Sequence, residues 1–480
     1  MTKRTKIVCT IGPASFKTAV IENLIKAGMN AARINFSHGT HESNGKMIDL
    51  IRKAADKLKV PVVIIADLQG PRIRVGILPK EGLTLKKGQL VKLSVSEKKL
   101  GANMIPVTYK NLVKDVSSGE RILLDDGKIE LVTKKIQSEV VEAEVRVGGV
   151  LTSNKGINLP DSVISINALT EKDKEDLKFI VRKDVDFVAL SFVKNAQDIL
   201  GLRFLIKDLV GGEAGKKNKI EIKIIAKIEK HEAIKEIDEI IYAADAIMVA
   251  RGDLGLEMPA EEVPLLQKKM ISKCLEAAKP VIVATQMLES MTHNPRPTRA
   301  EVSDVANAVI DHTDAVMLSA ETANGEYPVE AVQTMSRVII KTEASIFDDL
   351  PYSQSLMADQ KTDVVMSGLS RLLAEKIKAK AILAASLTGE TGRQISRFRP
   401  ELLIFVATDN EKVRRQLNLS WGIVPFILPT CKTVEELIER SLVYLRKEKF
   451  IKKSDKLIII AGEPVGAVGG VNWVEVKQVN

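Results

Sequence analysis

The chain of 480 residues has little cysteine and few aromatic residues. Its three cysteines, Cys9, Cys274 and Cys431, lie far apart and show no Cys-x-x-Cys spacing, which argues against a disulfide framework or a zinc site. Aromatic residues make up only 4% of the chain, too few for the stacking platforms that bind single-stranded nucleic acid. No apolar run approaches the roughly 18 residues needed to cross a bilayer. These absences predict a protein of the reducing cytoplasm with no membrane or nucleic-acid partner.

The net charge of +9 is not concentrated in any block of the sequence. Lysines alternate with acidic residues, as in 171–176, within a chain that is 28% charged and 45% hydrophobic. This is ordinary globular composition, and the length suits about three domains. We interpret the positive charge as favouring solubility and the binding of anionic small molecules. A catalytically silent scaffold or an RNA-binding protein is the alternative that would use this charge differently.

Eight β-branched runs separated by helical patterns predict an α/β fold built on a (β/α)8 TIM barrel. The third and fourth runs are separated by an insertion that reads as short alternating strands with glycine turns, which predicts an all-β lid at the catalytic rim. A purely decorative insertion is the alternative. After residue 346 the strand and helix pattern restarts as a C-terminal α/β domain. The predicted strands are 6–11, 32–36, 60–67, 186–192, 222–229, 246–250, 280–285 and 314–318.

These patterns divide the chain into three predicted domains. The catalytic barrel comprises residues 1–70 and 160–345, the lid 71–159, and the C-terminal domain 346–480. Catalytic residues of such barrels lie at the carboxyl ends of the strands, so polar residues at those ends are the candidates for chemistry.

Charged side chains end two of the apolar runs. Lys227 and Glu229 are two residues apart on a strand and project to the same face, and Asp253 follows the next run. Ionised groups are not left buried unless they pair or bind a metal. Two carboxylates beside a lysine suit a divalent cation and a phosphate. An internal salt bridge that closes a strand end is the alternative.

Other strand ends are polar as well. Arg33, Asn35 and Ser37 share one face by the period of two and lie beside Asp67. Each residue alone is weak support, but together the polar ends indicate phosphate and metal chemistry. The remaining members of this set are Ser191, Arg251, Thr285, Ser319 and Glu321.

Several segments resemble the pyruvate kinase family along nearly the whole chain. They are CTIGPAS from Cys9, RINFSHG from Arg33, GPRIR from Gly70, KGINLP from Lys155, AKIE from Ala226, VARGDLG from Val249, ATQMLESM from Ala284 and RAEVSDVANAV from Arg299. The resemblance implies phosphoryl transfer from phosphoenolpyruvate to ADP, giving pyruvate and ATP, with Mg2+ or Mn2+ as cofactor. It also implies a homotetramer. A metal-dependent mutase or aldolase acting on phosphoenolpyruvate or oxo acids is the alternative in the same fold.

The resemblance also implies a role for each matching residue. Glu229 and Asp253 would hold the metal, and Lys227 and Arg33 would meet the transferring phosphoryl group, where fixed cations stabilise the transition state. Thr285 would lie where the enolate is protonated, although its alternative role is strand-end hydrogen bonding. Further substrate contacts would come from Ser191, Phe192, Ala250, Arg251 and Gly252, and nucleotide contacts from Asn35, His38, Arg74 and Lys155.

One expected site departs from the common pattern of the family. Many members bind K+ at positions that correspond to Asn35, Ser37, Asp67 and the carbonyl of Leu68, with a glutamate nearby. Arg72 stands in place of that glutamate, as a basic residue does in the K+-independent branch. Two cations so close would repel by several kcal/mol at low effective dielectric. We therefore expect Arg72 to replace K+; the alternative is that its side chain merely points to solvent.

A loop in the C-terminal domain resembles the family's effector phosphate loop. Hydroxyls, glycines and open backbone amides at a helix amino end suit a phosphate, so a sugar phosphate or a nucleotide is the expected effector. The negative charge of Glu390 within the loop would repel an anion. The alternative is that the loop is an ordinary helix cap. The expected contacts are Ser386, Thr388, Gly389, Thr391, Gly392 and Arg393.

Overall fold

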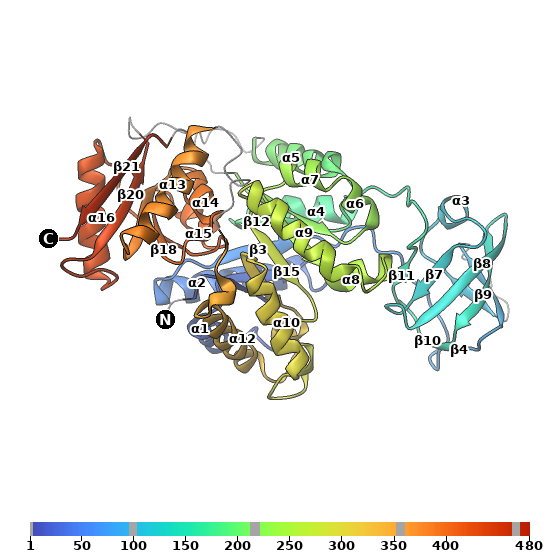
Figure 1. The fold of residues 1–480 in the computed structure, drawn as a ribbon. Coiled ribbons are helices and arrows are strands. Elements are labelled where there is room, and N and C mark those ends of the chain that lie inside the picture. The colour runs from blue at the N-terminus through green and yellow to red at the C-terminus, as the bar shows by residue number, and fades with distance from the viewer. Residues whose placement is uncertain (1–2, 96–102, 212–220, 352–360, 463–470) are drawn as a thin grey trace.

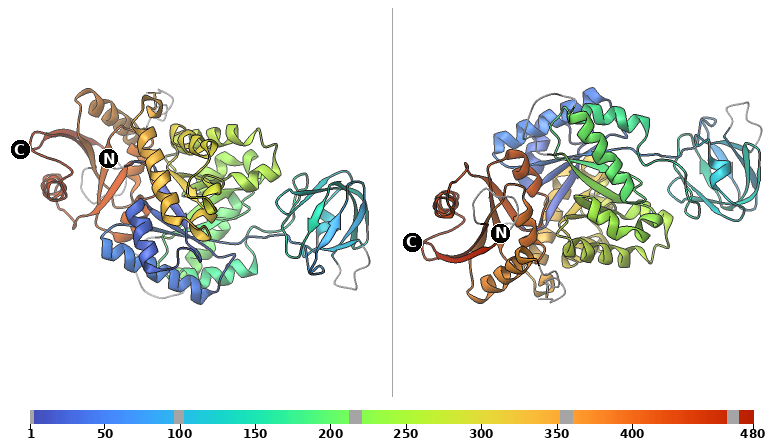
Figure 2. Two further views of the ribbon diagram at one scale, coloured as in Figure 1. Left: turned by 90° about the horizontal axis from the view of Figure 1, so that it is seen from below. Right: turned by 90° about the horizontal axis from the view of Figure 1, so that it is seen from above.

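The protein consists of a barrel with a smaller domain at each end. The computed structural model describes residues 3–95, 103–211, 221–351, 361–462 and 471–480. The barrel lies in the middle, the C-terminal domain flanks one side, and the all-β lid stands at the opposite end (Figures 1 and 2). The predicted architecture is therefore confirmed.

Eight parallel strands close the central barrel, in the order β1-β16-β15-β14-β13-β12-β3-β2. One face of each strand fills the barrel interior, where Val63, Phe187 and Met248 pack together, and the other face contacts the surrounding helices. Burial on both faces explains why these strands are almost continuously apolar. Their bounds are β1 Lys6–Thr10, β2 Ala31–Asn35, β3 Val63–Asp67, β12 Phe187–Leu190, β13 Lys223–Ile228, β14 Ala246–Ala250, β15 Val281–Ala284 and β16 Ala315–Leu318.

Helices surround the barrel, and local capping sets where several of them begin. Thr40, Thr170 and Thr298 each accept a hydrogen bond from the third residue of the helix that follows, whose side chain accepts one in return. The elements are α1 Thr18–Ala27, α2 His41–Leu58, α4 Glu171–Ile180, α5 Ala196–Gly211, α6 His231–Lys235, α7 Ile237–Ala243, α8 Arg251–Glu257, α9 Val263–Glu276, η1 Glu289–Thr292, α10 Arg299–Ile310, α11 Ala320–Ala323, α12 Pro328–Glu343 and η2 Ile346–Asp348.

The lid has its own hydrophobic core, which contains Val91, Leu131 and Val141. A six-stranded sheet in the order β11-β7-β8-β9-β5-β6 packs with the pair β10-β4. It lies beside α8, the helix that directly follows β14 (Figure 1). Its elements are β4 Leu83–Leu85, β5 Leu90–Ser94, β6 Met104–Pro106, α3 Leu112–Asp115, β7 Arg121–Leu124, β8 Ile129–Gln137, β9 Val140–Val147, β10 Gly149–Leu151 and β11 Ile157–Asn158.

The C-terminal domain is a five-stranded sheet in the order β19-β18-β17-β20-β21. The last strand, β21, pairs antiparallel with β20 at the sheet edge; its half-exposed residues have no continuous apolar run, so the sequence did not reveal it. In the described residues, no helix has the length and apolarity required to cross a membrane. The elements are α13 Thr362–Lys376, β17 Ala381–Ala385, α14 Glu390–Ser396, β18 Leu403–Thr408, α15 Glu411–Leu417, β19 Ile423–Ile427, α16 Val434–Lys447, β20 Lys456–Ala461 and β21 Trp473–Gln478.

Candidate active site

A buried cluster of charges lies at the carboxyl ends of the barrel strands. The Nζ atom of Lys227 lies 2.8 Å from Oε1 of Glu229 and 3.4 Å from Oδ1 of Asp67, and it donates a hydrogen bond of 2.7 Å to Oγ of Ser191. Each of these residues is at least nine-tenths buried. The structure thus brings together residues from β3 and from the ends of β12 and β13.

Arg33 joins this cluster through the same aspartate. Its Nε donates to Oδ2 of Asp67 at 2.6 Å and its guanidinium donates to Oγ1 of Thr10 at 3.0 Å. Asp67 therefore holds Arg33 on one carboxylate oxygen and Lys227 on the other. Two cations fixed side by side by one buried anion form a preorganised site for a multiply charged anion.

Burial and the neighbouring charges shift the pKa values of these groups in opposite directions. Burial pushes the pKa of Lys227 downward, but Asp67 and Glu229 outweigh it and hold that pKa above its ordinary value. Burial likewise pushes the pKa of Asp67 upward, and the charges of Lys227 and Arg33 hold it below its ordinary value. Lys227 and Asp67 are therefore both ionised at neutral pH.

Glu229 and Asp253 offer the carboxylates that a divalent cation requires. The backbone N–H of Phe192 donates to Oε2 of Glu229 at 2.8 Å and orients it. Asp253 lies in the first turn of α8, just beyond β14, instead of at the strand end itself. Burial raises the pKa of Glu229, Lys227 opposes the rise, and the charge of Asp253 adds to it. Two mutually repelling carboxylates fit a cation between them, so these residues would hold Mg2+ or Mn2+.

Thr285 and the start of α8 are fixed to each other. Oγ1 of Thr285 accepts a hydrogen bond of 2.8 Å from the N–H of Gly252 and donates one of 2.6 Å to the carbonyl of Ala284. Arg251 donates to the carbonyl of Thr285 at 2.8 Å and to both carboxylate oxygens of Asp304 at 2.7 Å. The Arg251 side chain therefore holds the start of α8 against the segments that carry Thr285 and Asp304. Sequence reasoning missed Asp304 as its partner, although Asp304 lies within the RAEVSDVANAV segment.

A cleft separates the lid from this rim, and both walls are charged. On the lid side, Lys155 pairs with Asp125 at 2.8 Å and Arg74 donates to the carbonyl of Asn154 at 2.7 Å. Burial, followed by the charges of Arg72, Arg74 and Arg33, lowers the pKa of His38. The basic and acidic residues that line the cleft are Arg72, Arg74, Asp125, Asp126, Lys155, Lys194, Lys230, Glu232 and Asp253.

Comparison with known proteins identifies the family. A model described as "Pyruvate kinase, barrel domain" matches residues 2–332, and one described as "Pyruvate kinase, alpha/beta domain" matches residues 365–477. The chain belongs to the pyruvate kinase family. The pyruvate kinase of Geobacillus stearothermophilus is 43% identical over 100% of this chain and 81% of its own length. That of Clostridium acetobutylicum is 42% identical over 99% of this chain and 100% of its own length.

A solved pyruvate kinase has the same fold. The crystal structure of the enzyme from Cryptosporidium parvum superposes with a TM-score of 0.92 at 36% sequence identity, and the match covers 100% of this chain and 97% of that one. The pyruvate kinase activity inferred from the motifs is therefore well supported, and the mutase or aldolase alternative is not favoured.

Three of the residues expected to bind K+, Asn35, Asp67 and Leu68, already accept hydrogen bonds from other protein groups through the expected oxygens. Oδ1 of Asn35 accepts from the N–H of Ser37 at 3.0 Å, and the carbonyl of Leu68 accepts from Oγ of Ser191 at 2.9 Å. Asp67 is engaged by Arg33 and Lys227, as described above. Arg72 is exposed in the cleft, and within the described ranges its side chain has no hydrogen-bond or ion-pair partner.

Glu321, which the sequence placed among the polar strand ends, has a structural role. Its side chain is fully buried and accepts hydrogen bonds from the N–H groups of Leu288 at 3.1 Å and Ser319 at 2.7 Å. The carboxylate therefore holds together the segments that follow β15 and β16.

The affinity of the Glu229 and Asp253 pair for a divalent cation should fall as pH falls. Binding needs the ionised carboxylate, and burial raises the pKa of Glu229. Protons therefore compete at a higher pH than for an ordinary glutamate. Below the Glu229 pKa, the Kd for Mn2+ should rise by up to about tenfold per pH unit, and binding should release a proton.

Calorimetric titration with Mn2+ from about pH 8 to pH 5 measures this dependence. Repeating it in buffers with different ionisation enthalpies counts the protons released. Glu229→Gln, which removes the titrating group, should flatten the profile, and a wild-type Kd that does not change over this range would contradict the prediction.

Proposed function

We propose that the protein transfers the phosphoryl group of phosphoenolpyruvate to ADP with Mg2+ or Mn2+, forming pyruvate and ATP. The single observation that carries this proposal is the cluster in which Asp67 holds Lys227 and Arg33 beside the carboxylate of Glu229. A cation bound by Glu229 and Asp253 would neutralise and orient the carboxylate and phosphate oxygens of the substrate.

The chain's own residues would act on the phosphoryl group by fixed charge. The transition state spreads negative charge over the equatorial oxygens of that group. Lys227 and Arg33 are held in place by their contacts with Asp67, so little reorganisation is needed as this charge develops. Their interaction is stronger with the transition state than with bound substrate, which raises turnover more than affinity.

Thr285 would assist protonation of the enolate after transfer. A hydroxyl group is too weak an acid to protonate it alone, and here it already donates to the carbonyl of Ala284. It would therefore orient a water molecule or take part in a proton relay. The hydrogen bond from Gly252 to Thr285 places the backbone of 250–252 next to this position, where the substrate carboxylate is expected.

The nucleotide would bind in the cleft between lid and rim. Arg74 and Lys155 extend from the lid, and His38 lies close enough to Arg72 and Arg74 for their charges to lower its pKa. Asn35 completes the expected nucleotide contacts. Closure of the lid would bring these cations to the phosphates and exclude water from the transfer step.

A coupled assay for pyruvate tests the proposed reaction. With phosphoenolpyruvate and Mg2+, pyruvate should form only when ADP is present, in equal amount with ATP. A mutase or aldolase would be indifferent to ADP. Pyruvate release at the same rate with and without ADP would overturn the proposal.

We also propose that Arg72 makes the enzyme independent of K+. In buffer free of K+ and Na+, activity should be near its maximum, and added K+ should change kcat by less than about twofold, because a second cation beside the guanidinium is repelled. Arg72→Glu should lower activity in that buffer by about tenfold or more, and K+ should restore part of it.

Tetramethylammonium chloride at equal ionic strength is the control for general salt effects in the K+ experiment. It should not rescue Arg72→Glu, because it is too large for a K+ site. A strong K+ requirement in the wild-type protein would refute the role assigned to Arg72.

We also propose that the loop before α14 binds the phosphate group of an effector. The negative charge of Glu390 would weaken this binding. Glu390 pairs with Arg393 at 2.7 Å and accepts from Gln394 at 3.0 Å, and Asp363 and Asp409 line the same cavity. Arg393, which the sequence predicted as a phosphate contact, does not line this cavity; it lines another one, beside Ala278 and Lys279 of the barrel. Glu390→Gln should therefore lower the activation constant for sugar phosphates or nucleoside monophosphates by about tenfold, because it removes a repelling charge from the cavity. Glu411→Gln, on the neighbouring helix α15, is the control; equal activation constants in all three proteins would contradict this role.

The homotetramer remains a proposal based on the family resemblance. Size-exclusion chromatography with light scattering measures the mass directly. A mass of four chains would support the proposal, and a monomer at assay concentration would refute it.

A further inference from the structure

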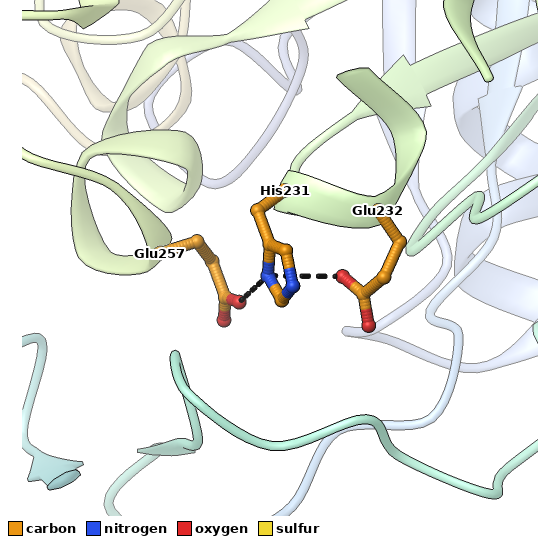
Figure 3. A group of neighbouring side chains, drawn as sticks. All are labelled: His231, Glu232 and Glu257. Carbon is orange, nitrogen blue, oxygen red and sulfur yellow. Dashed lines mark ion pairs between the residues drawn. The ribbon is translucent and has the colours of Figure 1, made fainter. Parts of the chain in front are cut away.

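A second cluster of metal-ligating side chains lies beside the catalytic centre, and one of its members, Glu232, also lines the cleft between lid and rim. His231 begins α6, two residues after Glu229, and its Nδ1 lies 3.2 Å from Oε2 of Glu232 and 3.9 Å from Oε2 of Glu257, the last residue of α8. The three potential ligand atoms all lie within 4.8 Å of one another. Figure 3 shows the imidazole between the two carboxylates.

The ligand atoms of this cluster lack hydrogen-bond partners in the described part of the chain. Nδ1 of His231 and Oε2 of both Glu232 and Glu257 are buried without one. The Glu257 side chain is only 1% exposed, and Lys230 pairs with its other oxygen, Oε1, at 2.7 Å. The Asn158 side chain from the lid also lies near this carboxylate and favours its ionised form. Oε2 of Glu257 nevertheless has no hydrogen bond, and an unsatisfied buried carboxylate oxygen is costly, so this atom points to a missing cation.

With a neutral His231, the charges of the cluster do not balance without such a cation. Lys230 supplies one positive charge against the two carboxylates of Glu232 and Glu257. Burial raises the pKa of Glu257, Lys230 opposes the rise, and the charge of Glu232 adds to it. The carboxylates therefore repel each other in a place where one lysine does not neutralise both.

We propose that His231, Glu232 and Glu257 form a second divalent-cation site that prefers Mn2+ or Zn2+ to Mg2+. Metal–ligand bonds of about 2.0–2.2 Å place neighbouring ligands roughly 3.0–3.5 Å apart. The 3.2 Å between His231 and Glu232 matches this range, and the 3.9 Å between His231 and Glu257 would shorten on binding. One imidazole and two carboxylates suit transition metals, whereas Mg2+ prefers oxygen ligands alone. The site goes beyond the proposed reaction and does not depend on it.

A cation in this site would connect two segments that support catalysis. Glu229 lies just before α6, and Asp253 lies in the first turn of α8, which ends at Glu257. Ligands from the start of α6 and the end of α8 would hold these helices together. Bound metal should therefore stabilise the rim at which the lid closes, apart from any effect of the catalytic cation.

Mn2+ binding measured by electron paramagnetic resonance tests the proposal on the full chain without nucleotide. Wild type should bind two Mn2+ per chain, and His231→Ala should bind one. Glu232→Gln should show the same loss, and His293→Ala, which changes an exposed histidine elsewhere on the barrel, should retain both sites. Equal Mn2+ stoichiometry in wild type and His231→Ala would overturn the proposal and would indicate that the cluster is only an ion pair of a protonated histidine.

Thermal unfolding gives a second readout that does not use activity. With the catalytic site saturated by excess Mg2+, micromolar Zn2+ or Mn2+ should raise the Tm of wild type and of His293→Ala, and should leave that of His231→Ala unchanged. A rise of the same size in all three proteins would place the metal elsewhere and refute the site. Circular dichroism of each variant checks that the fold is retained.

Discussion

Replacement of Lys227 by methionine should lower kcat by about 10³-fold or more, while the KM for phosphoenolpyruvate changes by less than about tenfold. The ammonium group is fixed between Glu229, Asp67 and Ser191, where it faces the expected transfer step. Methionine has a similar length but no charge. The loss should therefore fall on the transition state more than on the bound substrate.

Two measurements separate this effect from damage to the fold. Removal of one member of a buried ion pair can cost about 3–5 kcal/mol of stability, so thermal unfolding is measured alongside turnover. Mn2+ should still bind to Lys227→Met, because Glu229 and Asp253 remain. Lys223→Met, the same change at the opposite end of β13, is the matched control and should retain most of the activity. A kcat within tenfold of wild type for Lys227→Met would remove Lys227 from its proposed role.

Replacement of Glu229 by glutamine should raise the Kd for the catalytic Mn2+ by about 100-fold or more and should lower kcat/KM by a comparable or larger factor. An amide keeps the shape and can still accept from the N–H of Phe192, but it carries no charge for the cation or for Lys227. Glu229→Gln weakens metal binding and also removes an ion-pair partner of Lys227. For both reasons we expect its effect on activity to be among the two largest.

Glu236→Gln, an exposed glutamate just after α6, is the matched control for that experiment. It should bind Mn2+ and turn over substrate as wild type does. High Mn2+ should restore part of the activity of Glu229→Gln if weakened metal binding is the cause. An unchanged Mn2+ affinity in Glu229→Gln would show that Glu229 is a structural member of the cluster and not a metal ligand.

The barrel and the lid could be predicted because their signals are local. Strands buried on both faces are continuously apolar, and the helices between them repeat the same order. The period of two placed Lys227 and Glu229 on one face, and the structure joins them at 2.8 Å. By contrast, β21 is partly exposed and pairs antiparallel at a sheet edge, so it lacks the continuous apolar run that marks the buried strands.

Pairings between distant segments could not be predicted from local patterns. Asp67 is the last residue of β3, yet it holds Arg33 from β2 and Lys227 from β13. The position of Asp253 in a helix depends on where β14 ends, which propensity alone does not define within a residue or two. Asp304 beside Arg251 and Glu257 beside His231 likewise come from other helices.

The sequence by itself determined the eightfold repeat of strand and helix, the β insertion, the C-terminal domain and the family, because apolar periodicity and contiguous motifs are written along one chain. Only the tertiary structure decided that Asp67 is shared by two cations, that Asp304 anchors Arg251, and that Glu257 lies beside His231 with an unpaired oxygen. These contacts depend on closure of the barrel, which brings the carboxyl ends of separate strands to one rim and leaves their charges to be balanced there.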